Sequence, residues 1–228
     1  MAALGWKAVF WLFGVIGVLL GVLWFKFVPD NPKQSPYVNE AELEHINDGR
    51  ENTVEAKEIA PWGKLLKSSQ FWSLGLQFMI TDYIMYVFLA WLPLYLMEVH
   101  GFSLSKMGLW AAAPWLSLMA VVSCCGYLSD KAIAAGFSQN LVKTSTGAVG
   151  ILLCACTLFI ATRTADPMMN VFWLSVALGS LGLTMSASWS SVISMGGRFA
   201  GSVSGWMNFW GNIGGVLAPS VTAWVATT

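Results

Sequence analysis

Three apolar stretches of this 228-residue chain carry polar side chains at a similar distance from one end of each stretch. Uncharged hydrogen-bonding groups and an indole at one depth can replace the hydration shell of a small polar solute. Alternatively, the same groups only join neighbouring helices through hydrogen bonds. The set therefore predicts either a solute-binding cavity or interhelical contacts, at Gln77, Ser186, Ser188, Trp189, Asn208 and Asn212.

Asp82 is the one ionisable residue deep inside an apolar stretch. At 1.5 Å per residue it lies roughly 16 Å from residue 71, near the middle of a bilayer. A carboxylate at that depth is costly unless it is protonated or faces a polar cavity. Two interpretations stay open for Asp82: proton or substrate handling, or a protonated side chain hydrogen-bonded to a neighbouring helix.

The sequence offers no pattern typical of catalytic, metal or cofactor sites. It has no glycine-rich phosphate loop, and both histidines, His45 and His100, lie between apolar stretches. The four cysteines fall within apolar runs without a histidine at metal-ligand spacing, at Cys124, Cys125, Cys154 and Cys156. We therefore predict neither an enzyme nor a cofactor or metal site, and interpret the cysteines as small buried hydrophobic residues.

The composition excludes an ordinary soluble domain. Hydrophobic residues make up 56% of the chain and charged residues 11%, against about 25% charged residues in typical soluble proteins. Only nine charged residues remain after residue 70. The net charge is zero and there is no basic stripe, so we do not expect nucleic acid as a partner. The expected partner is the lipid bilayer.

Six apolar stretches are long enough to cross a bilayer as helices, since a hydrocarbon core of about 30 Å needs roughly 20 residues. Lipid cannot satisfy free backbone groups, and the stretches are too long and too little alternating for barrel strands. We therefore predict an all-α integral membrane protein with six transmembrane helices, at residues 5–28, 71–97, 107–128, 141–162, 168–195 and 199–226.

The only long polar segment, residues 29–67, separates the first two predicted helices. Asn39 is placed to cap a short helix there, and Trp62 with two lysines predicts a short interfacial helix before the second span. Placing the segment in the cytoplasm leaves outside only three of the twelve basic residues, Lys7, Lys106 and Arg163. Both termini then lie outside, so we expect further chain before residue 1.

Small residues and prolines predict how the helices pack and bend. Three glycine pairs have the four-residue spacing of close helix contacts, Gly17 with Gly21, Gly201 with Gly205, and Gly211 with Gly215. Three prolines can bend their helices, at Pro93, Pro114 and Pro219.

Four motifs resemble one family of membrane transporters. They are WGKLLKSSQFW from Trp62, FLAWLPLYL from Phe88, GYLSDK from Gly126 and AGSVSGWMNFWGNIGGVLAP from Ala200. Together they resemble the anion:cation symporter family of the major facilitator superfamily, which includes hexuronate, glucarate and galactonate permeases.

The resemblance implies an architecture for the chain. The six predicted helices correspond to helices six to eleven of a twelve-helix major facilitator fold. Residues 1–28 are then the last helix of an N-terminal bundle, residues 29–70 the cytoplasmic inter-bundle loop, and residues 71–228 five helices of a C-terminal bundle.

The resemblance also implies a function. The chain is expected to be a fragment of a transporter in the cell (inner) membrane that moves small organic anions, such as sugar acids, by alternating access with a coupling cation, H⁺ or Na⁺. Gly126 and Asp130 match a cytoplasmic loop that steadies one conformation, and Asp82 is a possible coupling residue. The alternative is a non-transporting six-helix interaction or assembly module.

Overall fold

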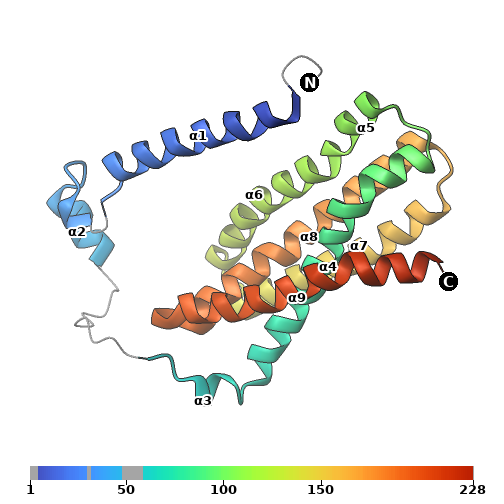
Figure 1. Ribbon diagram of the computed structural model, residues 1–228. Helices are drawn as coiled ribbons and strands as arrows, with labels where there is room; N and C mark the ends of the chain where they lie inside the picture. The colour runs from blue at the N-terminus through green and yellow to red at the C-terminus, as the bar shows by residue number, and fades with distance from the viewer. Residues whose placement is uncertain (1–4, 30–31, 48–58, 228) are drawn as a thin grey trace. The chain divides into compact units, whose positions relative to one another are not determined.

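The computed structural model describes residues 5–29, 32–47 and 59–227, and every regular element in these ranges is helical (Figure 1). The chain divides into two compact units, Met1–Glu58 and Ile59–Thr228. The first unit holds α1 (Gly5–Phe27), the short 3-10 helix η1 (Pro32–Gln34) and α2 (Glu40–Asn47). Asn39 caps α2 as predicted, because its Oδ1 accepts a hydrogen bond of 2.8 Å from the main-chain N–H of Glu42.

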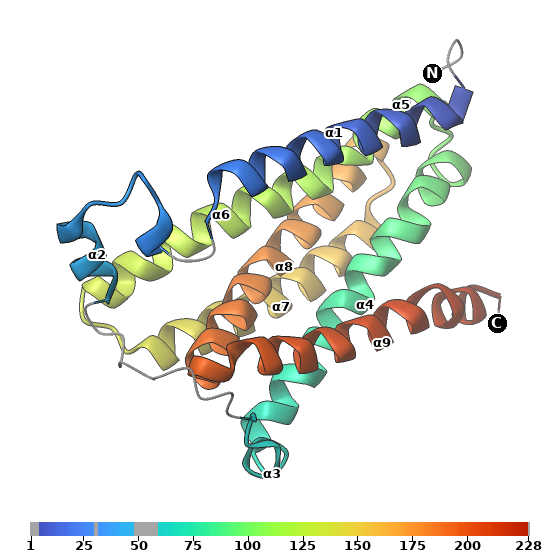
Figure 2. The same cartoon turned by 60° about the vertical axis from the view of Figure 1, so that its left-hand side comes forward.

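The second unit is a bundle of long helices around α8 (Figures 1 and 2). Helix α8 packs against α6, α7 and α9 and more lightly against α4, whereas α4 packs chiefly against α9. The short helix predicted at Trp62 is confirmed as α3, whereas its place at the membrane interface stays a prediction. The elements are α3 (Trp62–Leu65), α4 (Ser69–Glu98), α5 (Leu104–Trp110), α6 (Ala112–Ala134), α7 (Gln139–Arg163), α8 (Pro167–Gly196), η2 (Gly197–Phe199) and α9 (Ala200–Thr227).

Five segments of the described chain are long and apolar enough to cross a membrane. The last of them, Pro167–Thr227, is 61 residues long and holds both α8 and α9, joined by η2. Each of these two helices exceeds the roughly 20 residues that a bilayer requires. Gly197 makes the turn between them at φ 47°, a conformation that side-chain-bearing residues rarely adopt. The all-α membrane fold predicted from the sequence is confirmed.

The third predicted span, residues 107–128, is not one helix. It comprises α5 and α6, which are separated by a turn at Ala111, and α6 continues to Ala134. Pro114 explains the break, because it lacks an N–H and its ring excludes the carbonyl of the residue four positions earlier, Trp110. Pro93 and Pro219, in contrast, lie inside the continuous helices α4 and α9.

Glycines allow α4 and α9 to approach closely, but only one of the two glycine pairs predicted in α9 lies in this contact. A Cβ atom at Gly215 would lie 2.8 Å from the ring of Tyr86, and one at Gly211 would meet Phe78 at 2.9 Å. At Gly214 it would meet the main-chain oxygen of Met79. A Cβ atom added at Gly201 or at Gly205 would have no atom of another described residue within 4 Å, so that pair makes no close contact.

An aromatic cluster joins the start of α4 to α9. Trp206 stacks on Phe71, with ring centroids 4.8 Å apart, and its indole N–H donates to the Phe71 carbonyl at 3.3 Å. Trp72 meets Trp206 edge-on at 5.0 Å, and Trp210 completes the cluster at 5.7 Å from Trp206. Trp206 and Trp210 therefore serve to pack α9 against α4.

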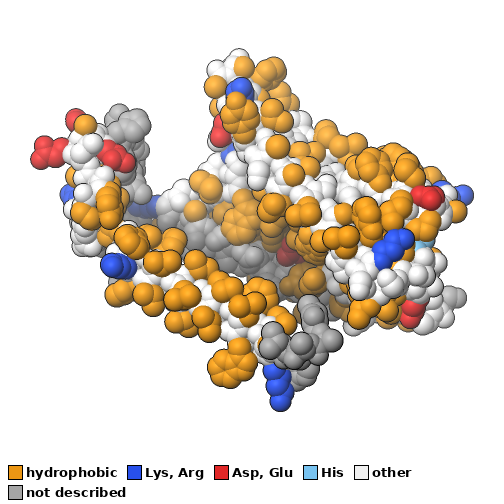
Figure 3. All heavy atoms as spheres, turned by 90° about the horizontal axis from the view of Figure 1, so that it is seen from above, with side chains coloured by type: hydrophobic (Ala, Val, Ile, Leu, Met, Phe, Trp, Pro, Cys, Tyr) orange, Lys and Arg blue, Asp and Glu red, His pale blue; other side chains and the backbone are white. Residues whose placement is uncertain are grey.

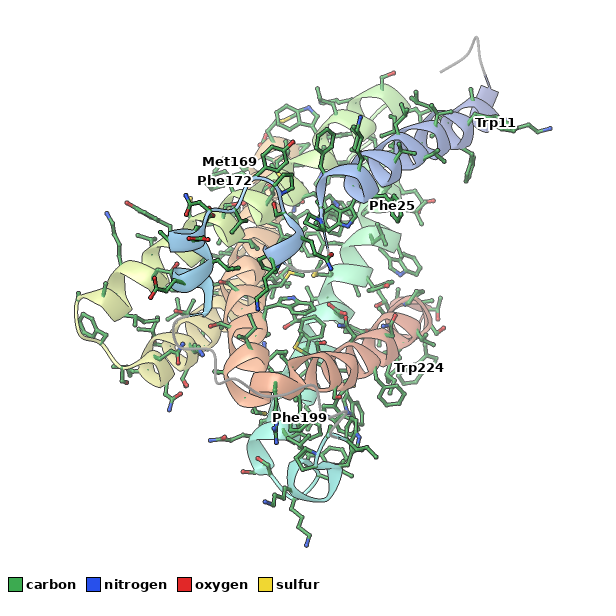
Figure 4. The ribbon with its side chains drawn as sticks, turned by 90° about the vertical axis from the view of Figure 1, so that its left-hand side faces the viewer. Trp11, Phe25, Met169, Phe172, Phe199 and Trp224 are labelled. Atoms are coloured by element: carbon green, nitrogen blue, oxygen red, sulfur yellow. The ribbon has the colours of Figure 1, made fainter. Side chains whose placement is uncertain are left out.

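The outward faces of the long helices are apolar, as expected of surfaces that meet lipid. Apolar side chains are spread over the face shown in Figure 3, with few charged side chains among them. Phe172 on α8 is 52% exposed and Trp224 on α9 is 67% exposed (Figure 4). Water would not favour such exposure for so many large apolar side chains, whereas hydrocarbon does.

Candidate functional site

Three predicted binding residues lie at one depth on helix ends that pack together. Gln77, Ser188 and Asn208 are each eight residues from the nearby end of α4, α8 and α9 respectively. At 1.5 Å per residue this is about 12 Å. The three ends share one apolar cluster, formed by Phe71, Leu74, Phe78, Val192, Val203 and Met207. The common depth expected from the sequence therefore follows from the way these helices pack.

A hydrogen bond between side chains links α4 to α8 at this depth. The hydroxyl of Ser188 lies 2.9 Å from Oε1 of Gln77 and 2.8 Å from the main-chain oxygen of Thr184. The amide nitrogen of Gln77 is 3.4 Å from the hydroxyl of Thr81. Ser188 is 2% exposed, so this pair forms part of the interior rather than the lipid-facing surface.

A polar cavity of about 800 Å³ lies between α4, α7 and α8, and Gln77 and Ser188 are part of its wall. Most of its other polar side chains are hydroxyls and amides, and no acidic residue belongs to its described wall. Lys143 is the single charged residue there. The polar part of the wall comprises Ser69, Gln70, Ser73, Gln77, Gln139, Asn140, Lys143, Thr144, Ser188, Ser191 and Ser194. Such a wall suits a small solute that carries hydroxyl groups and a negative charge.

A smaller pocket of about 180 Å³ lies between α6, α7 and α8 and contains Ser186, Gly126 and Asp130. The prediction that Gly126 and Asp130 belong to a loop is wrong, because both lie within α6. No proline interrupts the chain between Gly126 and Ala134, so the helix continues until Gly136 adopts φ 99°. Asp130 is exposed at the last turns of α6 and also lines this pocket.

Trp189, Asn208 and Asn212 lie outside the walls of both pockets. Trp189 is 38% exposed and meets Phe78 edge-on, with ring centroids 6.2 Å apart. The amide nitrogen of Asn208 donates to the Ser204 carbonyl at 3.0 Å, and that of Asn212 donates to the Asn208 carbonyl at 2.8 Å. The structure therefore brings Gln77 and Ser188 together, but it does not gather all six predicted residues in one cavity.

Asp82 lies on the side of α4 that faces α9. It is half-buried, and its carboxylate occupies the space that a side chain at Gly211 would need. Phe78, one turn earlier, packs on the same glycine. No basic side chain of the described residues forms an ion pair with Asp82. Its position between two helices leaves both predicted interpretations, proton handling and helix contact, open to experiment.

Lys143 is the residue of this region that sequence reasoning missed as a site residue. Its place near the start of an apolar stretch indicated a cation at the membrane surface. The structure instead buries its side chain, and Nζ donates to the Ser190 carbonyl at 3.1 Å and to the hydroxyl of Ser194 at 2.8 Å. The only sequence signal was that α7 has a lysine one turn inside its N-terminal cap, Ser138.

No metal site is present among the described residues, because no three His, Cys, Asp or Glu side chains lie close enough to hold an ion. All four cysteines are free. Cys125 and Cys154 are buried as expected, whereas Cys124 and Cys156 are exposed on the helix surfaces.

Replacing Ser188 by alanine tests whether its hydrogen bond to Gln77, which joins α8 to α4, stabilises the bundle. We expect Ser188→Ala to lower the stability of the bundle by about 1 kcal/mol, because Gln77 loses its partner. Ser123→Ala is the matched control, since Ser123 also bonds the carbonyl four residues earlier, at 3.0 Å, but has no partner on another helix. Thermal unfolding in detergent compares the two variants, and equal melting temperatures would contradict the role of the link.

Comparison with known proteins places the chain among membrane transporters. The model of the Major Facilitator Superfamily matches residues 1–219. The chloroplastic ascorbate transporter of Arabidopsis thaliana is 28% identical over 97% of this chain and 41% of its own length. A probable sulfoacetate transporter of Cupriavidus necator is 30% identical over 97% of this chain and 51% of its own.

The D-galactonate transporter of Escherichia coli O6:H1 is 28% identical over 98% of this chain and 54% of its own length. The chain thus spans about half the length of the curated relatives it matches. The names of these relatives describe transport rather than catalysis.

Proposed function

Since this chain belongs to the Major Facilitator Superfamily, we propose that it serves the transport of small organic anions, such as sugar acids, across a membrane. Galactonate, sulfoacetate and ascorbate, which name three of its relatives, are all small organic anions. The observation that carries the proposal is the hydrogen bond between Gln77 and Ser188 in the wall of an acid-free polar cavity. Solute hydroxyls can exchange with such a pair, and no fixed negative charge opposes an anion there.

The proposed substrate contacts come from three helices, with Gln77, Ser188 and Asn208 at one depth. The residues proposed to contact the substrate are Gln77 on α4, Ser186, Ser188 and Trp189 on α8, and Asn208 and Asn212 on α9. Amide and hydroxyl groups recognise the hydroxyls of a sugar acid, and the half-exposed indole of Trp189 offers a flat surface to its carbon chain.

Coupling and conformational change form the second part of the proposal. Asp82, packed between α4 and α9, is the candidate for proton coupling, because an intramembrane acid that changes protonation can bias how two helices pack. Gly126 and Asp130, near the end of α6, are proposed to steady one state of an alternating-access cycle. The coupling ion is H⁺ or Na⁺.

The proposed topology follows the distribution of basic residues. The chain is a multi-pass membrane protein, and we propose the cell (inner) membrane with the segment at residues 29–70 in the cytoplasm. Residues 1–28 would then be the last helix of one bundle. Residues 71–228 would supply five helices of a second bundle.

Uptake into vesicles tests the proposed function. The polypeptide that carries activity, whether this chain or a longer one containing it, should take up labelled galactonate saturably. Unlabelled glucarate should compete and galactose should not, because only the acids carry a carboxylate. A protonophore and removal of sodium identify the coupling ion separately. Equal competition by galactose would overturn the assignment to organic anions.

A further inference from the structure

We propose that a groove between α6 and α7 holds one acyl chain of a membrane phospholipid. The groove has a volume of about 520 Å³ and is lined by α6, α7, the turn between them and one residue of α8. Its described wall carries no charged residue and is mostly apolar, with Leu128, Phe137, Leu141 and Val149 among its side chains. The inference concerns a lipid rather than a transported solute, so it holds or fails independently of the proposed function.

The groove arises because α6 and α7 each pack closely on α8 but only lightly on each other. A Cβ atom added at Gly182 of α8 would lie 3.1 Å from the main-chain oxygen of Leu118 on α6. One added at Gly150 of α7 would lie 2.9 Å from the main-chain nitrogen of Thr184 on α8. These contacts hold both helices against α8, and Leu183 of α8 contributes to the wall between them. The groove is therefore built by three consecutive helices of the chain.

The hydroxyl groups in the wall are bonded within their own helices. Ser145 donates to the Val142 carbonyl at 3.1 Å, and Thr146 donates to the same carbonyl at 2.6 Å. The hydroxyl of Ser129 lies 3.8 Å from Sγ of Cys125, one turn earlier. A hydroxyl has a single hydrogen to donate, so Ser145 and Thr146 have none left for a ligand. An acyl chain needs none, whereas a polar ligand would lose its hydrogen bonds to water there.

The depth and the width of the groove fit a single hydrocarbon chain. Cys125 lies nine residues from the end of α6, and Val149 lies ten residues from the start of α7. At 1.5 Å per residue these depths are about 14 and 15 Å, half of a hydrocarbon core of about 30 Å. A volume of about 520 Å³ over this depth leaves a cross-section of roughly 35 Å², whereas a helix 10–12 Å across occupies at least about 80 Å². The groove therefore admits a chain from one leaflet but not a whole helix.

The turn after α6 fixes Phe137 at one end of the groove. Gly136 has φ 99° and its N–H donates to the Ile133 carbonyl at 3.0 Å, while the N–H of Phe137 donates to the Ala132 carbonyl at 3.2 Å. These two bonds form a Schellman motif, in which the residue after the glycine often packs on the last turn of the helix. Phe137 is 58% exposed and lines the groove together with Ala132. Its ring thus lies where an acyl chain would enter from the headgroup region.

The rim of the groove is exposed on both helices. Leu128 on α6 is 62% exposed and Leu141 on α7 is 57% exposed. In a membrane such side chains meet hydrocarbon, and an empty groove would forfeit dispersion contacts along both helices. An acyl chain between α6 and α7 supplies these contacts where the two helices make few with each other.

The test follows the lipid through a change of environment. The 228-residue chain is placed in nanodiscs of phosphatidylcholine that include phosphatidylcholine with a diazirine in one acyl chain. It is illuminated either in the nanodiscs or after transfer to detergent micelles. Lipid on open helix faces is diluted into the micelles, whereas a chain held in the groove is retained. Mass spectrometry of peptides measures the lipid adducts on α6 and α7 and compares them with those on α9, where Trp224 is 67% exposed.

In the wild-type chain we expect adducts at the groove to exceed those on α9 about fivefold or more after transfer, because each buried CH₂ group of a lipid adds to its retention. Ser145→Leu should remove this excess, since the larger side chain fills the groove. Phe137→Ala should reduce it by opening one end. Ser123→Leu is the matched control and should keep the excess. Ser123 is exposed on α6 outside the groove, and its hydroxyl bonds the Met119 carbonyl at 3.0 Å much as Ser145 bonds Val142.

Three results would overturn the proposal. The first is a wild-type chain that shows no excess at the groove after transfer, which would identify the lipid there as freely exchanging; this measurement does not depend on how any variant folds. The second is an undiminished excess in both Ser145→Leu and Phe137→Ala, which would place the retained lipid elsewhere on α6 or α7. The third is an absence of adducts at the groove even in the nanodiscs, which would mean that a protein surface such as a second copy covers it.

Discussion

Alanine at Asn208 or at Trp189 is expected to lower the uptake of a labelled sugar acid about tenfold or more, in the polypeptide that carries transport activity. Asn208 lies at the depth of the Gln77–Ser188 pair and presents an amide from α9, the third helix of the site. Trp189 is next to Ser188 on α8, and its exposed indole face can cover a solute. Asn208 bonds only within its own helix, and Trp189 contacts α4 through one edge-on ring pair with Phe78, so the loss should fall chiefly on binding.

Trp224→Ala is the matched control for this loss. Trp224 lies on the same helix as Asn208 but near the C-terminal end of α9, where it is 67% exposed. Membrane insertion should be unchanged in all three variants, and uptake should fall only in Asn208→Ala and Trp189→Ala. Normal uptake in both would reassign these side chains to packing.

Alanine at Gly214 is expected to cost about 2 to 3 kcal/mol of stability, since overpacking a tight contact costs roughly this amount. The added Cβ would meet the main-chain oxygen of Met79, and a backbone atom cannot rotate away as a side chain can. Helices α4 and α9 would have to separate. The contacts at Gly211 and Gly215, on the same helix face, would loosen with them.

Gly205→Ala provides the control for the second prediction. Gly205 is also in α9, and no described atom lies within 4 Å of a Cβ placed there. Alanine is the better helix former by up to about 1 kcal/mol, so this variant should be neutral or slightly more stable. Thermal unfolding of the two purified variants in the same detergent makes the comparison. Equal melting temperatures would show that α4 and α9 do not rely on close approach at Gly214.

The helices themselves could be predicted from the sequence, because in lipid each apolar stretch must satisfy its own backbone hydrogen bonds. The cap predicted at Asn39 is present. Three further helices begin at N-caps that the prediction did not use, since the side chains of Ser103, Ser138 and Asp166 each accept from the main-chain N–H three residues later. Pro114 predicted a bend, and the structure has a one-residue turn at Ala111, whose backbone stays in the α region at φ −66° and ψ −18°. The extension of α6 through Asp130 was missed because no local residue marks its end before Gly136.

Only the tertiary structure decided which helix faces pack against each other. The glycine pairs at Gly201 and Gly211 have the same spacing, yet only the second lies against α4, since spacing identifies a helix face but not the neighbour that faces it. The pairing of Gln77 with Ser188 joins residues 111 positions apart, and nothing local to either residue specifies it.

Lys143 shows the same limit for charge. In the sequence it is a basic residue near the end of an apolar stretch, a position where lysine usually reaches the membrane surface. Its burial results from α8 placing Ser190 and Ser194 beside it, across 47 and 51 positions of the chain. The sequence by itself determined a helical membrane protein with polar groups at one depth, because the bilayer acts on each segment separately. The structure decided which of those groups share a cavity and which charge lies within it, because these depend on contacts between helices distant in the chain.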